Sequence, residues 1–326
     1  MVLKRRFFLF KHTKKGGKKM IHWGIIGTGY IAGRFAASLK KEPRCTLAAV
    51  SSRNLTKAEE FAKKISAEKA YAGHDSLLAD KNIDAVYIAL PHALHKEFSI
   101  KALKAGKAVL CEKPATLNFA EMEEIAKVAR AEKKLFMEAM KPRFVPLYEK
   151  IKSARGEIGE ITRVETSLCN LMELTGKTYH TQKGQGGALL DVGIYCTSWL
   201  EDFLGEITGV KKVSVKIENE IDYYVDAELN FGEKTGRLEC AFDRKKPRQA
   251  IIYGTNGKII VEELHRPQSM TINDKIISVP YEVDDFFGEI KHFVNCLEEG
   301  KIESEIMPLN SSLNCAKILE SISKNF

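Results

Sequence analysis

The sequence predicts a doubly wound α/β Rossmann domain, with a parallel sheet, followed by an α+β domain with a large, open, mainly antiparallel sheet. In residues 20–141, about six short apolar runs alternate with helical patterns, as right-handed βαβ crossovers require. Past residue 142 the runs alternate apolar with polar residues and are separated by Gly or Asn-Gly turns. We therefore expect a dinucleotide-binding domain over residues 20–141 and a substrate-binding and dimerisation domain over residues 142–326.

A glycine-rich turn joins the first predicted strand, which ends in Ile25 and Ile26, to the first predicted helix. Gly27 permits a tight bend, Gly29 lets the backbone approach a pyrophosphate, and Ala32 lets the helix pack closely on the strand. Free N–H groups and the helix dipole then favour phosphate binding. The residues expected to line this phosphate site are Gly27, Thr28, Gly29, Tyr30 and Ile31.

Capping residues mark the helices of the first domain. Asn54 and Asp75 stand where N-caps are expected, Gly106 closes a helix, and Asn118 with Glu121 resembles a capping box. The expected strands are 21–26, 45–51, 69–71, 85–90, 108–111 and 135–140, and the longer helices are 93–104 and 118–131.

The second domain is expected to combine a sheet with a few helices, which leaves one broad sheet face uncovered. Exposed apolar sheet area is usually an interface, so we expect a homodimer or a dimer of dimers. The expected strands are 161–171, 210–217, 223–231, 235–242 and 249–253, and the expected helices are 146–154, 188–204, 285–298 and 310–323.

The net charge of +8 arises from one end of the chain. Residues 1–19 hold eight Lys or Arg and no acid, whereas the remainder holds 43 basic and 43 acidic residues. A neutral body lacks the electrostatic footprint of a nucleic-acid partner, and no apolar run reaches membrane-spanning length. We interpret residues 1–19 as a disordered basic tail and expect neither nucleic acid nor a membrane as partner.

The seven cysteines are odd in number and form no Cys-x-x-Cys pair. This pattern is typical of reduced thiols in the cytoplasm rather than of a disulfide framework or a zinc site. The sequence therefore predicts a cytoplasmic protein without a metal.

The end of the second strand decides the cofactor, because a carboxylate there binds a ribose 2′-hydroxyl and an Arg accommodates a 2′-phosphate. The chain has Ser52 and Arg53 at this point and no acid before Glu59. A hydroxyl and a guanidinium together favour NADP, with NAD as the alternative. The competing interpretation is that Arg53 is a solvated surface residue.

Two more segments follow strands at the edge where open α/β sheets bind ligands. Leu90, Pro91, His92 and His95 follow the fourth strand, and a cofactor-lining loop explains them better than a metal site. Glu112 and Lys113 follow the fifth strand. A Lys near a nicotinamide and partly desolvated is expected to have a lowered pKa and to polarise a substrate hydroxyl; a surface salt bridge is the alternative.

The segment Gly186–Tyr195 is the clearest signal in the second domain. Asp191 and Tyr195 are four residues apart, so a helix presents both on one face, and a carboxylate beside a phenol suits proton transfer. A glycine inside a helix, such as Gly193, lowers the stability of the helix. We therefore interpret Gly193 as a position where a ligand must approach closely. In the alternative interpretation Tyr195 is a core aromatic and Asp191 complements the helix dipole.

Together the phosphate loop, residues 90–95, Gly106–Pro114 and Gly186–Tyr195 resemble the Gfo/Idh/MocA oxidoreductase family in order and spacing, from Met20 to Phe326. The resemblance implies hydride transfer between NAD(P) and a sugar, polyol or related alcohol carbon. It implies Lys113 as the catalytic lysine, Asp191 as its supporting carboxylate and Tyr195 as the acid/base.

Many members carry His where this chain has Tyr195, and Tyr is more like the dihydrodiol dehydrogenase and D-xylose dehydrogenase branch. The segment Met137–Phe144 resembles that branch too, and Arg143 in it is counted among the expected cofactor contacts. At position 141 this chain has Lys, where members of that branch commonly have an aromatic residue.

These observations predict an NADP-dependent oxidoreductase that acts on a small-molecule alcohol. A non-catalytic NADP-binding sensor on the same fold is the alternative, because fold alone does not separate the two. Retention of Lys113, Asp191 and Tyr195 together favours the enzyme. Chemistry like that of biliverdin reductase is a third possibility and does not require these three residues.

Overall fold

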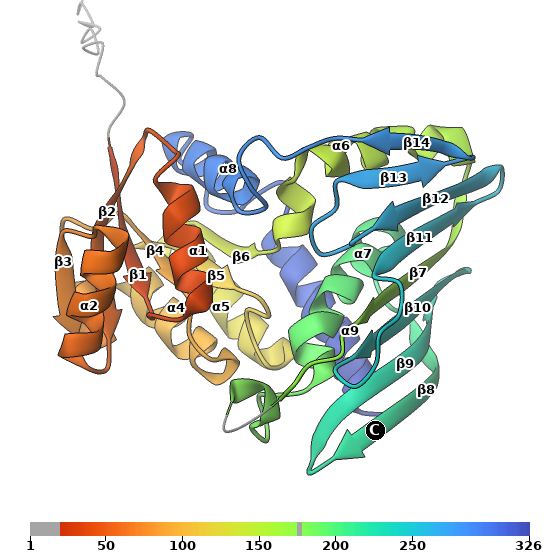
Figure 1. The fold of residues 1–326 in the computed structure, drawn as a ribbon, viewed down its shortest axis with the longest axis horizontal. Helices are drawn as coiled ribbons and strands as arrows, with labels where there is room; N and C mark the ends of the chain where they lie inside the picture. Colours follow the sequence, from red (N-terminus) through yellow and green to blue (C-terminus); the bar gives the residue numbers. More distant parts are fainter. Residues whose placement is uncertain (1–19, 175–177) are drawn as a thin grey trace, which may run out of the picture.

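The computed structural model describes residues 20–174 and 178–326, so the expected basic tail, residues 1–19, lies outside the described residues. The first half is built on a six-stranded parallel sheet in the order β3-β2-β1-β4-β5-β6 (Figure 1). The order reverses between β1 and β4, which is the switch point where doubly wound sheets bind ligands. The strands are β1 (Ile21–Ile26), β2 (Cys45–Ser52), β3 (Lys69–Ala72), β4 (Ala85–Ile88), β5 (Ala108–Glu112) and β6 (Phe136–Ala139).

Two of the expected helix caps in this half are confirmed. The side chains of Asn54 and Asn118 each accept a backbone N–H three residues on, at 3.0 Å. Asp75 was expected to cap a helix, but it lies in the first turn and the N-cap is Gly73. The helices are α1 (Tyr30–Leu39), α2 (Leu55–Ile65), α3 (His74–Ala79), η1 (His92–Leu94), α4 (His95–Lys104) and α5 (Phe119–Glu132).

The second half is built on an eight-stranded sheet in the order β14-β13-β12-β11-β7-β10-β9-β8. Its pairs are antiparallel except β7 with β10, which run parallel, so the sheet is not the simple meander that the turns predict. The two short strands at its edge, β13 and β14, were not expected. The strands are β7 (Ile161–Cys169), β8 (Gly209–Glu218), β9 (Ile221–Phe231), β10 (Lys234–Ala241), β11 (Gln249–Gly254), β12 (Gly257–Glu262), β13 (Ser269–Ile272) and β14 (Lys275–Ser278).

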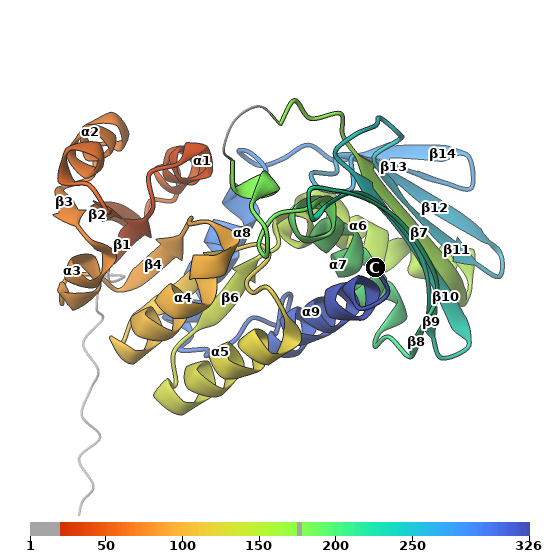
Figure 2. The ribbon, with the colours of Figure 1, turned by 90° about the horizontal axis from the view of Figure 1, so that it is seen from below.

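Among the described residues, helices cover only one face of this sheet, the face turned toward the first half (Figure 2). The expected helix over residues 188–204 begins as a π-helical turn, η5, before α7. Trp199 on α7 is fully buried and donates its indole N–H to the Leu264 carbonyl. The elements are η2 (Lys141–Phe144), α6 (Pro146–Ser153), η3 (Ala154–Ile158), η4 (Tyr179–Thr181), η5 (Leu189–Gly193), α7 (Ile194–Leu204), α8 (Phe287–Glu298) and α9 (Leu309–Ser323).

The open face of the large sheet is more polar than the sequence suggested. Along β10, Leu238 and Cys240 point into the core, so Arg237 and Glu239 point to the open face. There Arg237 makes two 2.8 Å bonds to the Asp226 carboxylate, and Glu239 accepts from Tyr224 at 2.8 Å. The expectation of a broad apolar surface is therefore wrong for this part of the sheet.

Elements from the end of the chain join the two halves. Helix α9 runs beside α5 of the first half and α7 of the second (Figure 2). Ser38 on α1 donates to Asp284 at 2.8 Å, and Arg34 pairs with Asp285. Among the described residues, no helix combines the length and the apolar character needed to cross a membrane.

Candidate active site

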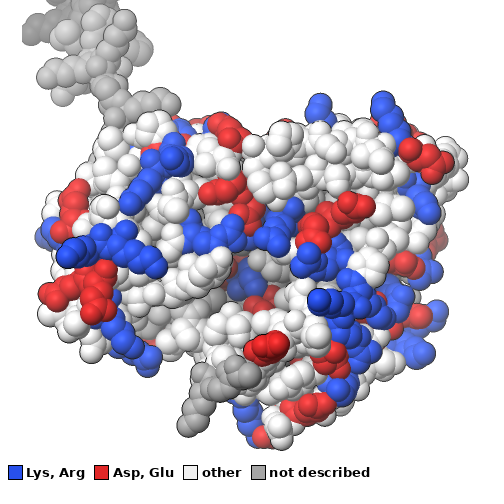
Figure 3. All heavy atoms as spheres, viewed as in Figure 1, with Lys and Arg blue, Asp and Glu red and all other residues white. Residues whose placement is uncertain are grey.

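A cavity of about 650 Å³ opens at the carboxyl ends of β1, β2, β4 and β5 and is closed on its other side by residues of η4 and α7. Figure 3 shows a hollow between the two halves of the molecule, bordered by Lys and Arg side chains. The volume lies within the range of small-molecule and cofactor sites. The lining residues are Gly27, Thr28, Gly29, Tyr30, Ile31, Ser52, Arg53, His74, Ala89, Leu90, Pro91, His92, Leu94, His95, Glu112, Lys113, Tyr179, His180 and Tyr195.

The glycine turn between β1 and α1 has the form that a pyrophosphate needs. Gly27 has a φ of +114°, and a Cβ there would lie 2.3 Å from the Ala89 carbonyl oxygen, so no other residue fits. Gly29 is the N-cap residue of α1, and a Cβ on it would meet nothing within 4 Å. The open space in front of Gly29 and the N–H groups at the start of α1 together fit a dinucleotide phosphate.

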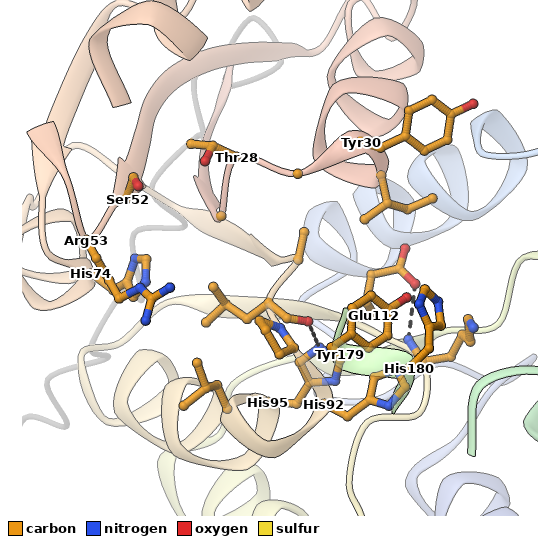
Figure 4. Close-up of a pocket in the computed structure, with 18 of the residues that line it drawn as sticks. Thr28, Tyr30, Ser52, Arg53, His74, His92, His95, Glu112, Tyr179 and His180 are labelled. Atoms are coloured by element: carbon orange, nitrogen blue, oxygen red, sulfur yellow. Dashed lines mark hydrogen bonds between the residues drawn. The ribbon is translucent and has the colours of Figure 1, made fainter. Parts of the chain in front are cut away.

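Ser52 and Arg53 lie at one end of the cavity, beside His74 (Figure 4). The His74 imidazole contacts the Ser51 hydroxyl, with 2.9 Å between Nδ1 and Oγ. Burial lowers the pKa of His74, so the ring is neutral at pH 7. The cation at this end of the cavity is therefore Arg53.

The other end of the cavity holds an ion pair between the two halves. The Lys113 Nζ lies 2.9 Å from Asp191 Oδ1 and 2.6 Å from the Asp191 carbonyl oxygen. Burial opposes ionisation of both groups, but each charge stabilises the other, so the pKa of Lys113 is raised and that of Asp191 is lowered. The expectation of a lowered pKa for Lys113 is wrong because the carboxylate lies so close.

The π-helical turn η5 positions Asp191. Gly187 precedes the turn with a φ of +106°, and a Cβ there would overlap the Asp222 carboxylate. Asp222 in turn accepts the Leu189 N–H at 2.7 Å. Gly193 was expected to make room for a ligand, but a Cβ there would lie 3.2 Å from Cys240 Sγ, so it serves the packing of η5 on β10.

Tyr195 lines the cavity and is 8% exposed. The Lys113 ammonium lies over its ring, 4.8 Å from the ring centroid. Burial raises the pKa of Tyr195, and the charge that most opposes this shift is that of Lys141 rather than Lys113. Lys141 is itself buried and is held by Asp285, with 2.7 Å between Nζ and Oδ2.

Comparisons with known proteins decide the family. A family profile described as "Oxidoreductase family, NAD-binding Rossmann fold" (GFO_IDH_MocA) matches residues 21–140, and the matching C-terminal domain profile covers residues 150–260. The chain belongs to the Gfo/Idh/MocA oxidoreductase family.

Characterised relatives of the family align along most of the chain. The trans-1,2-dihydrobenzene-1,2-diol dehydrogenase of Mus musculus is 33% identical, over 93% of this chain and 96% of that one. The scyllo-inositol 2-dehydrogenase (NADP(+)) IolU of Bacillus subtilis is 32% identical, over 94% of this chain and 97% of that one. A 3-ketoreductase from Actinomadura kijaniata, crystallised with NADP and TDP-benzene, has a TM-score of 0.86 and 26% identity, covering 94% of this chain and 98% of that one.

Within this Gfo/Idh/MocA site, the two expected histidines have different surroundings. His92 Nδ1 lies 3.0 Å from the Gln185 carbonyl oxygen and donates to it, and burial lowers the pKa of His92 to about 3. His95 Nδ1 and Nε2 each lie 2.8 Å from a backbone carbonyl oxygen, of Pro114 and Leu90. His95 thus ties the loop after β4 to the loop after β5.

Arg143 does not line the cavity. Its guanidinium is buried against α7, where it bonds Glu201 Oε2 at 2.6 Å and Ser198 Oγ at 2.8 Å. The expectation that Arg143 contacts the cofactor is wrong, because its hydrogen-bonding groups already join η2 to α7.

Tyr179 and His180 line the cavity, but sequence reasoning missed them. They come from η4, and Tyr179 stacks edge-on against His92 with ring centroids 5.1 Å apart. His180 Nε2 lies 3.5 Å from Asp191 Oδ2, so this carboxylate faces Lys113 on one side and an imidazole on the other. The only signal in the sequence was aromatic and imidazole side chains shortly before Gly186.

Two further carboxyl groups are buried: Glu112 lines the cavity, whereas Glu289 is not among the lining residues. Glu112 accepts a hydrogen bond from the Tyr87 hydroxyl and another from the Lys113 N–H at 3.2 Å. Glu289 on α8 is fully buried, and neither of its oxygens has a partner among the described residues. Burial raises the pKa of Glu289 well above its usual value, which favours its protonated form.

Proposed function

We propose that this protein is an NADP-dependent oxidoreductase that oxidises or forms a secondary alcohol carbon of a neutral polyol, diol or sugar. The observation that carries the proposal is the Lys113–Asp191 ion pair beside Tyr195, in which Lys113 and Tyr195 line the cavity that begins at the glycine turn. The diol, inositol and sugar-ketone chemistry named for the relatives supports the substrate class.

The side chains divide the proton chemistry among themselves. The hydride would be supplied or accepted by a nicotinamide when this cofactor is bound. The Tyr195 hydroxyl gives a proton to the carbonyl oxygen, or takes one from the alcohol in the reverse direction. Lys113 donates a hydrogen bond to the same oxygen, and Asp191 keeps Lys113 charged and fixed in place.

The far end of the cavity selects the cofactor. Ser52 and Arg53 offer a hydroxyl and a guanidinium to a 2′-phosphate, and no carboxylate follows β2 before Glu59. We expect NADP(H) to bind more tightly than NAD(H). The remaining proposed cofactor contacts come from the phosphate turn, at Gly27 and Gly29, and from the loop at Leu90 and His92. The other members of this set are Thr28, Tyr30, Ile31, Pro91, His95 and Glu112.

The same proposal assigns a separate role to each of the two parts of the chain. Residues 20–141 bind the cofactor, and residues 142–326 bind the substrate and form a homodimer through the open face of the large sheet. The ion-pair network of Arg237 and Asp226 on that face would make this contact a largely polar one. All seven cysteines are free thiols, which supports a cytoplasmic location.

The test is a panel of cyclic diols, inositols and aldoses with NADP⁺ or NAD⁺, followed by the absorbance of reduced nicotinamide. We expect turnover with at least one cyclic diol or polyol, and its loss in Lys113→Met while NADPH still binds. Tight NADPH binding without turnover of any alcohol or ketone in the panel would favour the sensor function instead.

A further inference from the structure

A cluster of three side chains with metal-ligand chemistry lies outside the cavity, where α8 ends. His292 and Cys296 are one helical turn apart on α8, and Glu305 lies in the segment that leads to α9. One ligand atom of each residue lies within 4.8 Å of those of the other two. The His292 Nε2 and Cys296 Sγ atoms are 3.3 Å apart.

The contacts of the Ser304 hydroxyl favour the His292 tautomer that binds a metal through Nε2. The Ser304 hydroxyl oxygen accepts the backbone N–H groups of Ile306 and Met307, both at 3.0 Å. Its own hydrogen is therefore free to point to His292 Nε2, which lies 2.8 Å away. An Nε2 that accepts this hydrogen carries the lone pair, and the ring proton is on Nδ1.

The spacing suits a zinc ion. A tetrahedral zinc ion holds nitrogen and oxygen ligands at about 2.0–2.2 Å and a thiolate at about 2.3 Å, so neighbouring ligand atoms lie roughly 3.3–3.6 Å apart. The imidazole and the thiol already have this separation. Glu305 is exposed and can close the remaining distance by turning its side chain.

We propose that His292, Cys296 and Glu305 form a zinc-binding site at the end of α8. A thiolate, an imidazole and a carboxylate suit Zn²⁺ and not Mg²⁺ or Ca²⁺, which take oxygen ligands. Binding forms a zinc–sulfur bond and releases the thiol proton to water. The fourth position is left to water, because the three residues supply only three ligand atoms.

The site would fix one end of α8. A second cavity, of about 340 Å³, is lined by His292 together with Phe144 and Asp284, so the cluster borders the region where the two halves meet. Asp284, just before α8, accepts a hydrogen bond from Ser38 on α1. A metal that joins α8 to the segment around Glu305 is expected to stabilise this packing and not to take part in the chemistry at Lys113.

Two contacts of the cluster must break when the metal binds, and they lower the expected affinity for zinc. Glu305 Oε2 lies 3.1 Å from Lys301 Nζ, and this exposed ion pair must open. Lys301 keeps a second partner in Glu299, at 2.7 Å, so the loss is small. The Ser304 hydrogen must also turn away from His292.

The experiment is a titration of chelator-treated, full-length protein with Co²⁺, which reports tetrahedral thiolate ligation by its visible and near-ultraviolet bands. We expect one Co²⁺ per chain with a thiolate charge-transfer band, and displacement of Co²⁺ by Zn²⁺. Cys296→Ser should abolish the charge-transfer band, and Glu305→Gln should weaken binding at least tenfold. The matched controls are Cys45→Ser and Glu282→Gln, an exposed carboxylate that pairs with Lys291 outside the cluster, and both should bind as the wild type does.

Folding of each variant is checked by circular dichroism, with Cys296→Ala as a second thiol variant if Cys296→Ser is unstable. Zinc should raise the melting temperature of the wild type and of both controls, and leave that of the Cys296 variants unchanged. Absence of a charge-transfer band in the wild type, or a band that survives in Cys296→Ser, would overturn the proposal.

Discussion

Replacing Tyr195 by Phe removes one oxygen atom from the wall of the proposed active site and little else. The hydroxyl forms no hydrogen bond with another of the described residues, and the ring is already packed beneath the Lys113 ammonium at 4.8 Å. The change in the free energy of unfolding is therefore expected to stay within about 1 kcal/mol. The proton-transfer group, in contrast, disappears completely.

The expected loss follows from the role assigned to the hydroxyl. A positioned acid or base contributes about 10²–10⁴ in rate, which corresponds to a barrier increase of about 3–5 kcal/mol. NADPH affinity should be unchanged, because the phosphate turn lies on β1 and α1 and Tyr195 lies on α7. We therefore expect kcat to fall by that factor while the dissociation constant for NADPH is unaltered.

A second tyrosine in the wall of the cavity provides a matched control for Tyr195→Phe. Tyr179 is a second phenol of the same wall, and its pKa is also raised, by burial. Tyr179→Phe makes the same chemical change and should reduce kcat less than about tenfold. The assay is steady-state turnover on the best substrate of the panel, with NADPH binding measured by fluorescence. Near-normal turnover in Tyr195→Phe, or a larger loss in Tyr179→Phe, would refute the assignment.

Three further predictions concern charge. Arg53→Ala should weaken NADPH binding by about 10- to 100-fold and leave NADH binding unchanged, because a charge-assisted phosphate contact is lost. Parallel titrations with NADPH and NADH measure both affinities, and equal affinities of the wild type for the two cofactors would contradict the prediction. Lys141→Met should move the rising limb of the pH–rate profile for alcohol oxidation to higher pH, because the positive charge that favours the tyrosinate is removed. The pKa values of buried His92 and His265 are lowered to about 3, so their contribution to stability is complete above pH 6.5 and is lost as the pH falls toward 3. At pH 5 we expect each histidine to have lost about 2 kcal/mol of the free energy of unfolding, partly offset by Asp222, whose pKa is raised to about 6. Urea denaturation at pH 7.5 and at pH 5 measures the difference.

Local sequence determines much of this fold, because its strongest signals act over a few residues. The turn at Gly27 requires a positive φ, Asn54 and Asn118 satisfy helix N–H groups, and buried parallel strands are continuous apolar runs. These preferences depend little on the rest of the chain. The same holds for Lys113 and Asp191, whose motifs end a strand and begin a helix and so place them at defined edges.

Tertiary contacts decide what the sequence did not predict. Tyr179 and His180 enter the cavity because the chain folds back from β7 before η5, and no local pattern specifies that return. Arg143 is drawn away from the cavity by Glu201, which is 58 residues further along the chain. The parallel pairing of β7 with β10 is likewise a long-range choice between strands that all look alike in sequence.

The proposed catalytic groups are not all held by one half of the molecule, and this determines how the site can fail. Lys113 follows β5, whereas Asp191 lies on η5, so the 2.9 Å ion pair exists only while the two halves remain packed. Asp285 fixes the same interface, because it binds Arg34 on α1 and Lys141 beside the tyrosine. Removing one partner by mutation while the halves stay packed would leave the other charge buried and unpaired, which is costly. Catalysis and interdomain packing therefore depend on the same few charges, whereas the phosphate turn depends only on the first half.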